Sequence, residues 1–237
     1  MRPSGATSHL NVAAARIWVA ALAAAVILTG CAPHAGGSRD VLWRIVSRCL
    51  DASSPDYCTA CASPIEGACV DARGCKATVD VWAKTADYVA IRDIKMCGCP
   101  IGFVHGLALP RARVTGVEDA RRPAGIWPFA WQTAQSRIAD EQQVALVVNP
   151  PGLERTQDQL HVHLLRLAPG ARARLASDSP ARAPHLERVW DVAARHAAAK
   201  GLASYGVLVM RDDAAKDFLV ITPPKSPEDQ FTVGTCR

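Results

Sequence analysis

The sequence LVVNPPGLERTQDQLHVHLLRL, which runs from Leu146 to Leu167, decides the fold of this chain. It contains two apolar runs, and a segment with two prolines and a glycine joins them. Turn residues clustered between two apolar runs indicate a pair of neighbouring strands with a loop between them. We therefore predict strands at roughly residues 143–149 and 159–167.

The second of these strands carries two histidines, His161 and His163, with one residue between them. Because side chains alternate between the faces of a strand, the two imidazoles share one face and three apolar side chains share the other. The three apolar residues are Leu160, Val162 and Leu164. One face can thus pack on a core while the other presents paired histidines, which is the layout of a functional site.

The rest of the chain supplies further strands in adjacent pairs, with single helices between them. Apolar and β-branched runs predict strands at 88–94, 101–109, 205–210 and 218–222. Apolar residues at helical spacing predict helices at 41–49, 129–142 and 186–200. The arginine-rich residues 171–184 are predicted to form a mobile loop. Neighbouring strand pairs interrupted by helices favour an α+β fold with an antiparallel sheet over a parallel one.

The first 30 residues have the features of a bacterial export signal. Residues 17–29 are uncharged and mostly apolar, but a bilayer-spanning helix needs ~20 such residues, so the run suits the centre of a signal peptide. It ends in Leu-Thr-Gly-Cys, which resembles a lipoprotein cleavage site and makes Cys31 the predicted lipidated residue. An uncleaved membrane anchor is the alternative. Either way we predict a tether at 31–39 and a folded domain at 40–237, held at the inner membrane and facing the periplasm.

The charge and the cysteine content narrow the class of protein. The chain has a mild formal net charge of +5, and its arginines are dispersed along the sequence. Both features argue against a nucleic-acid partner. Of the nine cysteines, eight remain when Cys31 is set aside. An even number in an exported chain indicates up to four disulfides, whose pairing stays open, with an irregular cysteine-rich loop at about residues 50–80. The less favoured alternative is a zinc site built from Cys58, Cys61, Cys97 and Cys99.

The run VVNPPGLERTQDQLHVHLL resembles the signature of the histidine triad superfamily, in which an asparagine, a glutamine and an H-x-H strand follow in that order. Within that superfamily the chain resembles the bacterial CDP-diacylglycerol pyrophosphatase family. The supporting segments are YVAIRD, ALPRAR, WPFAWQ, RTQ and SYG. The resemblance covers residues 40–50 and 86–237. It implies a histidine-triad-like α+β fold, in which an antiparallel sheet is packed with helices.

The resemblance offers two assignments for the histidines. Aligned without a gap from Gln157, the family's nucleophile falls on His163, and His161 is the first histidine. Leu165 then stands where the family has a third histidine. A register shifted by two residues places the triad on Gln159, His161 and His163 and makes His161 the nucleophile. The gapless register is favoured, and both remain open.

The resemblance implies hydrolysis of the pyrophosphate bond of CDP-diacylglycerol to CMP and phosphatidate through a nucleotidyl-histidine intermediate. A neutral imidazole is a competent nucleophile near pH 7. The implied phosphate donors are Asn149 and Gln157, and Asp93 is the acid that holds the ribose. Arg155 and Thr156 stand where they can meet a phosphate. The scheme needs no cofactor and no metal, and its expected partners are the lipid substrate and the membrane.

Two other functions remain open. The first is a more general exported nucleotide pyrophosphatase or nucleotidyl transferase that uses the same histidine. The second is a metal-binding envelope lipoprotein, because an H-x-H pair on one strand face has suitable ligand spacing. The remaining histidines considered carry no pattern and are interpreted as surface or packing residues; they are His105, His185 and His196. The sequence does not indicate an oligomeric state.

Overall fold

The structure is a computed structural model, and it describes residues 38–50, 63–66, 78–212 and 214–236. The chain divides into two units, Met1–Gly36 and Gly37–Arg237. The first unit lies outside the described residues, so the export signal, the lipidation of Cys31 and the tether stay predictions. Among the residues that are described, no helix has the length and apolar character that crossing a membrane requires.

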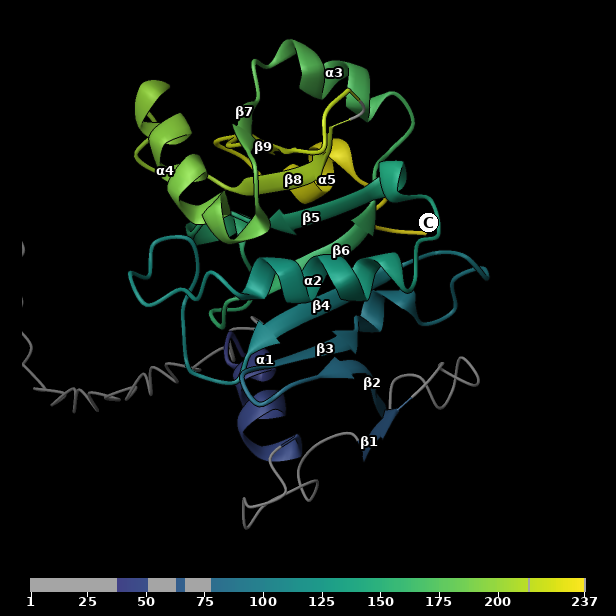
Figure 1. The fold of residues 1–237 in the computed structure, drawn as a ribbon. Helices are drawn as coiled ribbons and strands as arrows, with labels where there is room; N and C mark the ends of the chain where they lie inside the picture. The colour runs from purple at the N-terminus through teal and green to yellow at the C-terminus, as the bar shows by residue number, and fades with distance from the viewer. Residues whose placement is uncertain (1–37, 51–62, 67–77, 213, 237) are drawn as a thin grey trace, which may run out of the picture. The chain divides into compact units, whose positions relative to one another are not determined.

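A nine-stranded sheet forms the centre of the second unit (Figure 1), in the order β1-β2-β3-β4-β6-β5-β8-β9-β7. β1 runs parallel to β2, and the other neighbouring pairs are antiparallel. The predicted antiparallel α+β sheet and its three predicted strand pairs are therefore confirmed. The strands are β1 (Ser63–Glu66), β2 (Thr78–Lys84), β3 (Tyr88–Arg92), β4 (His105–Pro110), β5 (Val144–Val148), β6 (Val162–Arg166), β7 (Ala181–Ala183), β8 (Val207–Arg211) and β9 (Phe218–Ile221).

Two segments predicted to be loops contain regular structure instead. The segment 50–80 includes β1 and the start of β2, and the segment 171–184 includes the helix α3 (Ala171–Ser177) and β7. These elements are short, so their sequences are too brief to show a clear period. β7 exists because it pairs with β9, which is a contact between distant parts of the chain.

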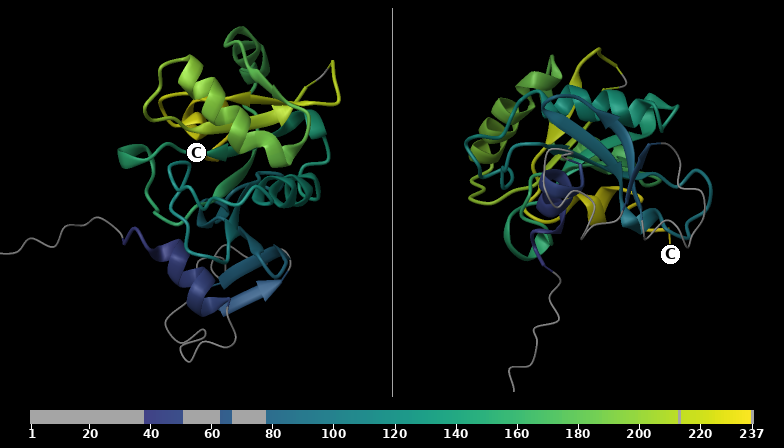
Figure 2. Two further views of the ribbon diagram at one scale, coloured as in Figure 1. Left: turned by 60° about the vertical axis from the view of Figure 1, so that its left-hand side comes forward. Right: turned by 90° about the horizontal axis from the view of Figure 1, so that it is seen from below.

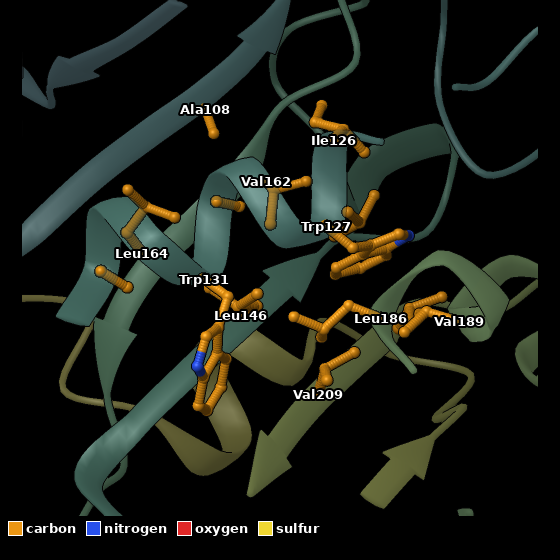
Figure 3. Packing of buried hydrophobic residues seen from close by; sticks show 14 of the residues in the cluster. Ala108, Ile126, Trp127, Trp131, Leu146, Val162, Leu164, Leu186, Val189 and Val209 are labelled. Carbon is orange, nitrogen blue, oxygen red and sulfur yellow. The ribbon is translucent and has the colours of Figure 1, made fainter. Parts of the chain in front are cut away.

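One face of the sheet is covered by α2 (Ile126–Gln135) and α4 (Val189–Ala199). The apolar stripe of α2 brings Trp127 and Trp131 onto the sheet, and Trp127 meets Trp190 of α4 edge-on with ring centroids 4.7 Å apart. The central strands contribute alternate residues to the same cluster (Figure 3): Leu146, Val162, Leu164 and Val209. This main core fixes which side of β6 faces inward.

The opposite face of the sheet has two separate covers (Figure 2). The helix α1 (Val41–Arg44) continues as a π-helical turn (Ile45–Cys49), and together they pack on β2, β3 and β4. The helices α3 and α5 (Pro227–Phe231) pack on β5, β8 and β9. The middle of this face, over β4 and β6, therefore lies between the two covers.

The strand register places His163 on this middle part, and His161 directly precedes β6, which is shorter than the predicted strand. β6 pairs with β4 so that His163 lies opposite Leu107, and it pairs with β5 so that His163 lies opposite Val147. The alternation predicted for this strand is confirmed, because the main core contains Leu160, Val162 and Leu164. His161 and His163 consequently point to the other face, where both line a cavity.

The described cysteines are all in disulfides; they are Cys49, Cys97, Cys99 and Cys236. Cys99 bonds to Cys236 and so ties the loop after β3 to the end of the chain. This confirms the predicted oxidised state for these residues. It contradicts the zinc alternative, because Cys97 and Cys99 have no free thiolate to offer. The other two cysteines of that alternative, Cys58 and Cys61, lie outside the described residues.

Candidate active site

A cavity of about 760 Å³ lies over the middle of the sheet face that carries the histidines. It brings together six of the predicted site residues: Asp93, Asn149, Thr156, Gln157, His161 and His163. Arg155 does not line it. The guanidinium of Arg155 is buried beside the cavity and donates two hydrogen bonds, of 2.7 and 3.0 Å, to the carboxylate of Glu118.

His161 is held by the backbone, and one of its ring nitrogens faces the cavity. Its Nδ1 lies 2.7 Å from the backbone oxygen of Gln159. A carbonyl oxygen only accepts hydrogen bonds, so Nδ1 carries the proton and Nε2 carries a lone pair. No described residue hydrogen bonds to this Nε2, and the protein does not fully cover it. Burial lowers the pKa of His161, so the ring is neutral near pH 7.

His163 belongs to a chain of hydrogen bonds that ends at the C-terminal segment. Its Nδ1 lies 3.0 Å from Nε2 of His105, and Nδ1 of His105 lies 3.1 Å from the backbone oxygen of Gly234. Because Gly234 accepts, His105 carries its proton on Nδ1, and neutral His105 accepts the Nδ1 proton of His163. The Nε2 of His163 therefore has the lone pair, yet this atom is covered by protein and has no hydrogen-bond partner among the described groups.

His105 is a site residue that the sequence did not identify. It is fully buried and bonded to His163, which corrects its interpretation as a surface or packing residue. His105 lies opposite Leu165 across the β4–β6 pair, at the position where the gapless register lacks a third histidine. The neighbouring strand thus supplies an imidazole at this place. A lone histidine in an apolar strand gives no signal of such a role, because strand register depends on tertiary contacts.

Glu228 of α5 is the second site residue that the sequence did not identify. Its buried carboxylate accepts a 2.8 Å hydrogen bond from Nδ2 of Asn149 and pairs with Nζ of Lys95 at 2.6 Å. The carboxylate oxygens also lie 3.4 Å from Nε2 of His163 and 3.6 Å from Nε2 of His105. Burial opposes ionisation, but the neighbouring histidines and Lys95 outweigh it and lower the pKa of Glu228 to about 2. A negative charge therefore stands beside His163 at neutral pH.

Three of the predicted binding residues have protein partners of their own. Asn149 bonds to Glu228, as described, and so holds α5 against the sheet. Gln157 accepts from the backbone N–H of Leu42 in α1 and donates to the backbone oxygen of Ser38, which precedes that helix. Asp93 accepts a 2.8 Å hydrogen bond from the backbone N–H of Lys95. These side chains therefore build the cavity wall as well as line it.

One group of described residues has the geometry of a metal site. Asp93, His105 and His163 each offer one ligand atom, and these atoms lie within 4.8 Å of one another. A carboxylate with two imidazoles suits zinc and other transition metals. His161 is not part of this group, so the group differs from the H-x-H pair that the sequence suggested as metal ligands.

Comparison with known families gives one match. A family model described as CDP-diacylglycerol pyrophosphatase matches residues 37–196, which is more than half of the chain. The matched range contains His105, His161 and His163, and it ends before β8, β9 and α5. No curated protein matches the chain. Glu228 thus lies outside the matched range, in the segment that closes the cavity.

Proposed function

The chain belongs to the CDP-diacylglycerol pyrophosphatase family, a family of hydrolases that act on phosphorus anhydrides, and from this premise we propose that His161 is its nucleophile. In the first step, Nε2 of His161 attacks the phosphorus on the cytidine side of CDP-diacylglycerol. A P–N bond forms, and the P–O bond to the bridging oxygen breaks with release of phosphatidate. In the second step, water attacks the same phosphorus, the P–N bond breaks, and CMP leaves.

The observation that carries this proposal is that Nε2 of His161 has no hydrogen bond to a described residue, on a ring that lines the cavity. The lone pair of His163 is covered, and the ionised carboxylate of Glu228 lies 3.4 Å from it. An anionic phosphate that approached His163 would meet this negative charge at close range. The geometry therefore favours the shifted register, with His161 as nucleophile, over the gapless register that the sequence favours.

We assign to His163 the proton that the attacking water loses in the second step, which requires Nε2 to become exposed to the cavity that the ring lines. Burial holds the pKa of His163 well below its usual value, so the ring is unprotonated at neutral pH, and the carboxylate of Glu228 opposes part of this lowering. Glu228 stabilises the imidazolium that then forms, and His105 holds the ring in the required tautomer. Lys95, on the cavity wall, supplies positive charge for the phosphate oxygens.

The purified protein is expected to convert CDP-dioleoylglycerol in detergent micelles to equal amounts of CMP and phosphatidate. Turnover should persist in excess EDTA, because an imidazole nucleophile and an imidazole base need no metal. Brief incubation with substrate labelled at the cytidine-side phosphorus should leave acid-labile label on the protein. Product chromatography and scintillation counting of the precipitated protein measure the two results.

Other outcomes would favour other functions. Loss of turnover in EDTA that added zinc restores would point to a metal held by Asp93, His105 and His163. Turnover of CDP-choline at the same kcat/KM would indicate a general nucleotide pyrophosphatase. Absence of labelled protein at every quench time, with normal turnover, would contradict the covalent step.

A further inference from the structure

Three of the four exposed large apolar side chains in the described part of the chain line the cavity. The four are Val41, Ile94, Ile101 and Leu153. Val41 is 38% exposed, Ile94 is 62% exposed, and Leu153 and Ile101 are fully exposed. All except Ile101 line the cavity. A cluster of exposed apolar side chains around a cavity marks a place where an apolar ligand or surface binds.

The sheet continues this apolar character into the cavity on one side of the histidines. Ile91 of β3 lies opposite Leu107 of β4, and Leu107 lies opposite His163 of β6, so the three form one row across the sheet. All three side chains line the cavity. On the other side of His163 the lining is polar, with Asn149 and Glu228. The cavity therefore has an apolar arm over β3 and β4 and a polar arm beside α5.

The first helix completes the apolar arm and adds positive charge to it. Leu42 and Ile45 line the arm from the helical side, and Val79 of β2 lines it from the sheet. Arg44 and Arg48, one turn apart, belong to the same wall. The arm is thus suited to a ligand that joins an apolar portion to an anionic group.

We propose that the apolar arm binds the glycerol and the first acyl carbons of the lipid substrate, an assignment that rests on the function proposed above. Pockets that enclose small molecules measure roughly 300–1,000 Å³, so this cavity of about 760 Å³ holds the headgroup and glycerol but not two complete acyl chains. The acyl chains of the substrate leave the cavity past Val41, Ile94 and Leu153, whose side chains contact them. Arg44 and Arg48 complement the charge of the phosphatidate phosphate.

The test uses neutral polar substitutions at the rim. Leu153→Asn and Ile94→Asn are compared with Ile101→Asn, which alters a fully exposed residue that does not line the cavity. The measured quantity is the ratio of kcat/KM for CDP-dioleoylglycerol in Triton X-100 micelles to kcat/KM for monomeric CDP-dibutyrylglycerol, whose chains end near the rim. Each rim variant should lower this ratio about tenfold, the factor expected for losing one leucine-sized apolar contact. Ile101→Asn should leave it unchanged.

An unchanged ratio in both rim variants, or an equal fall in Ile101→Asn, would overturn the assignment. Sedimentation with substrate-free dioleoylphosphatidylcholine vesicles adds a second check. If the rim variants lose binding to these vesicles, the residues dock on a bilayer instead of holding the substrate, and the assignment is again overturned. Failure of the proposed function would be distinguishable from failure of this assignment. The unsubstituted protein would then form no labelled adduct with either substrate.

Discussion

Replacing His161 with alanine is expected to lower kcat for CDP-diacylglycerol hydrolysis by on the order of 10⁴-fold or more, as loss of the nucleophile does in enzymes with a covalent intermediate. The labelled adduct should disappear at the same time. The fold should persist, because the ring of His161 lines the cavity and its only hydrogen bond in the described structure goes to the backbone of Gln159. Quenched-flow labelling and a thermal unfolding curve measure the two effects.

The His163→Ala variant separates the two registers. If His161 is the nucleophile and His163 the base, this variant still forms the adduct but hydrolyses it slowly, so label accumulates. Loss of the adduct in His163→Ala, together with its retention in His161→Ala, would instead establish the gapless register and contradict our proposal. His185→Ala is the matched control, because His185 is exposed and does not line the cavity. Its kcat and adduct level should match those of the unsubstituted protein.

The paired histidines were predictable because their arrangement is local. Strand alternation alone places His161 and His163 on one face, and the apolar residues between and beside them show which face is inward. Asn149 was identified through the family resemblance instead, and in the structure it directly follows β5. Asp93 directly follows β3, and it too lies at the cavity. The roles of these two residues came from the family motif, because a polar residue at a strand end does not by itself indicate a site.

The partners of His163 were not predictable, because they arrive from distant parts of the chain. His105 is 58 positions away in sequence and meets His163 only through the β4–β6 register. Glu228 meets Asn149 across 79 positions, and α5 has only five residues. An acidic residue near the start of a short helix is expected to be exposed. Nothing local distinguishes Glu228 from its exposed neighbour Asp229, so only the folded chain reveals its burial.

The C-terminal segment, from α5 to Cys236, contributes groups to the site although it lies far from the histidine motif in sequence. Its helix α5 carries Glu228, and the backbone oxygen of Gly234 orients His105. The disulfide from Cys236 to Cys99 then ties the end of this segment to the loop after β3. His163, the proposed base, therefore depends on contacts with the C-terminal segment. This dependence makes Glu228 the most informative residue to alter after His161.

Glu228→Gln is expected to lower kcat on the order of 10²-fold while it changes KM little, the size of effect typical for weakening a general base. The steady-state amount of labelled adduct should rise. The amide oxygen of glutamine still accepts from Asn149, so the wall of the cavity is kept. The amide lacks the charge that stabilises the imidazolium of His163, and only the second step forms that imidazolium. Rapid-quench labelling and steady-state kinetics measure both effects.

A purely structural role for Glu228 predicts a different pattern. Loss of packing would lower adduct formation and hydrolysis together, whereas loss of the charge slows hydrolysis alone, so adduct would accumulate as kcat falls. Glu228→Asp keeps the charge on a shorter side chain and should recover part of kcat without accumulation of adduct. Glu187→Gln makes the same chemical change at an exposed position away from the cavity and should alter neither quantity. If the adduct of Glu228→Gln falls in parallel with kcat, the carboxylate only holds α5 in place, and the proton of the attacking water must go elsewhere.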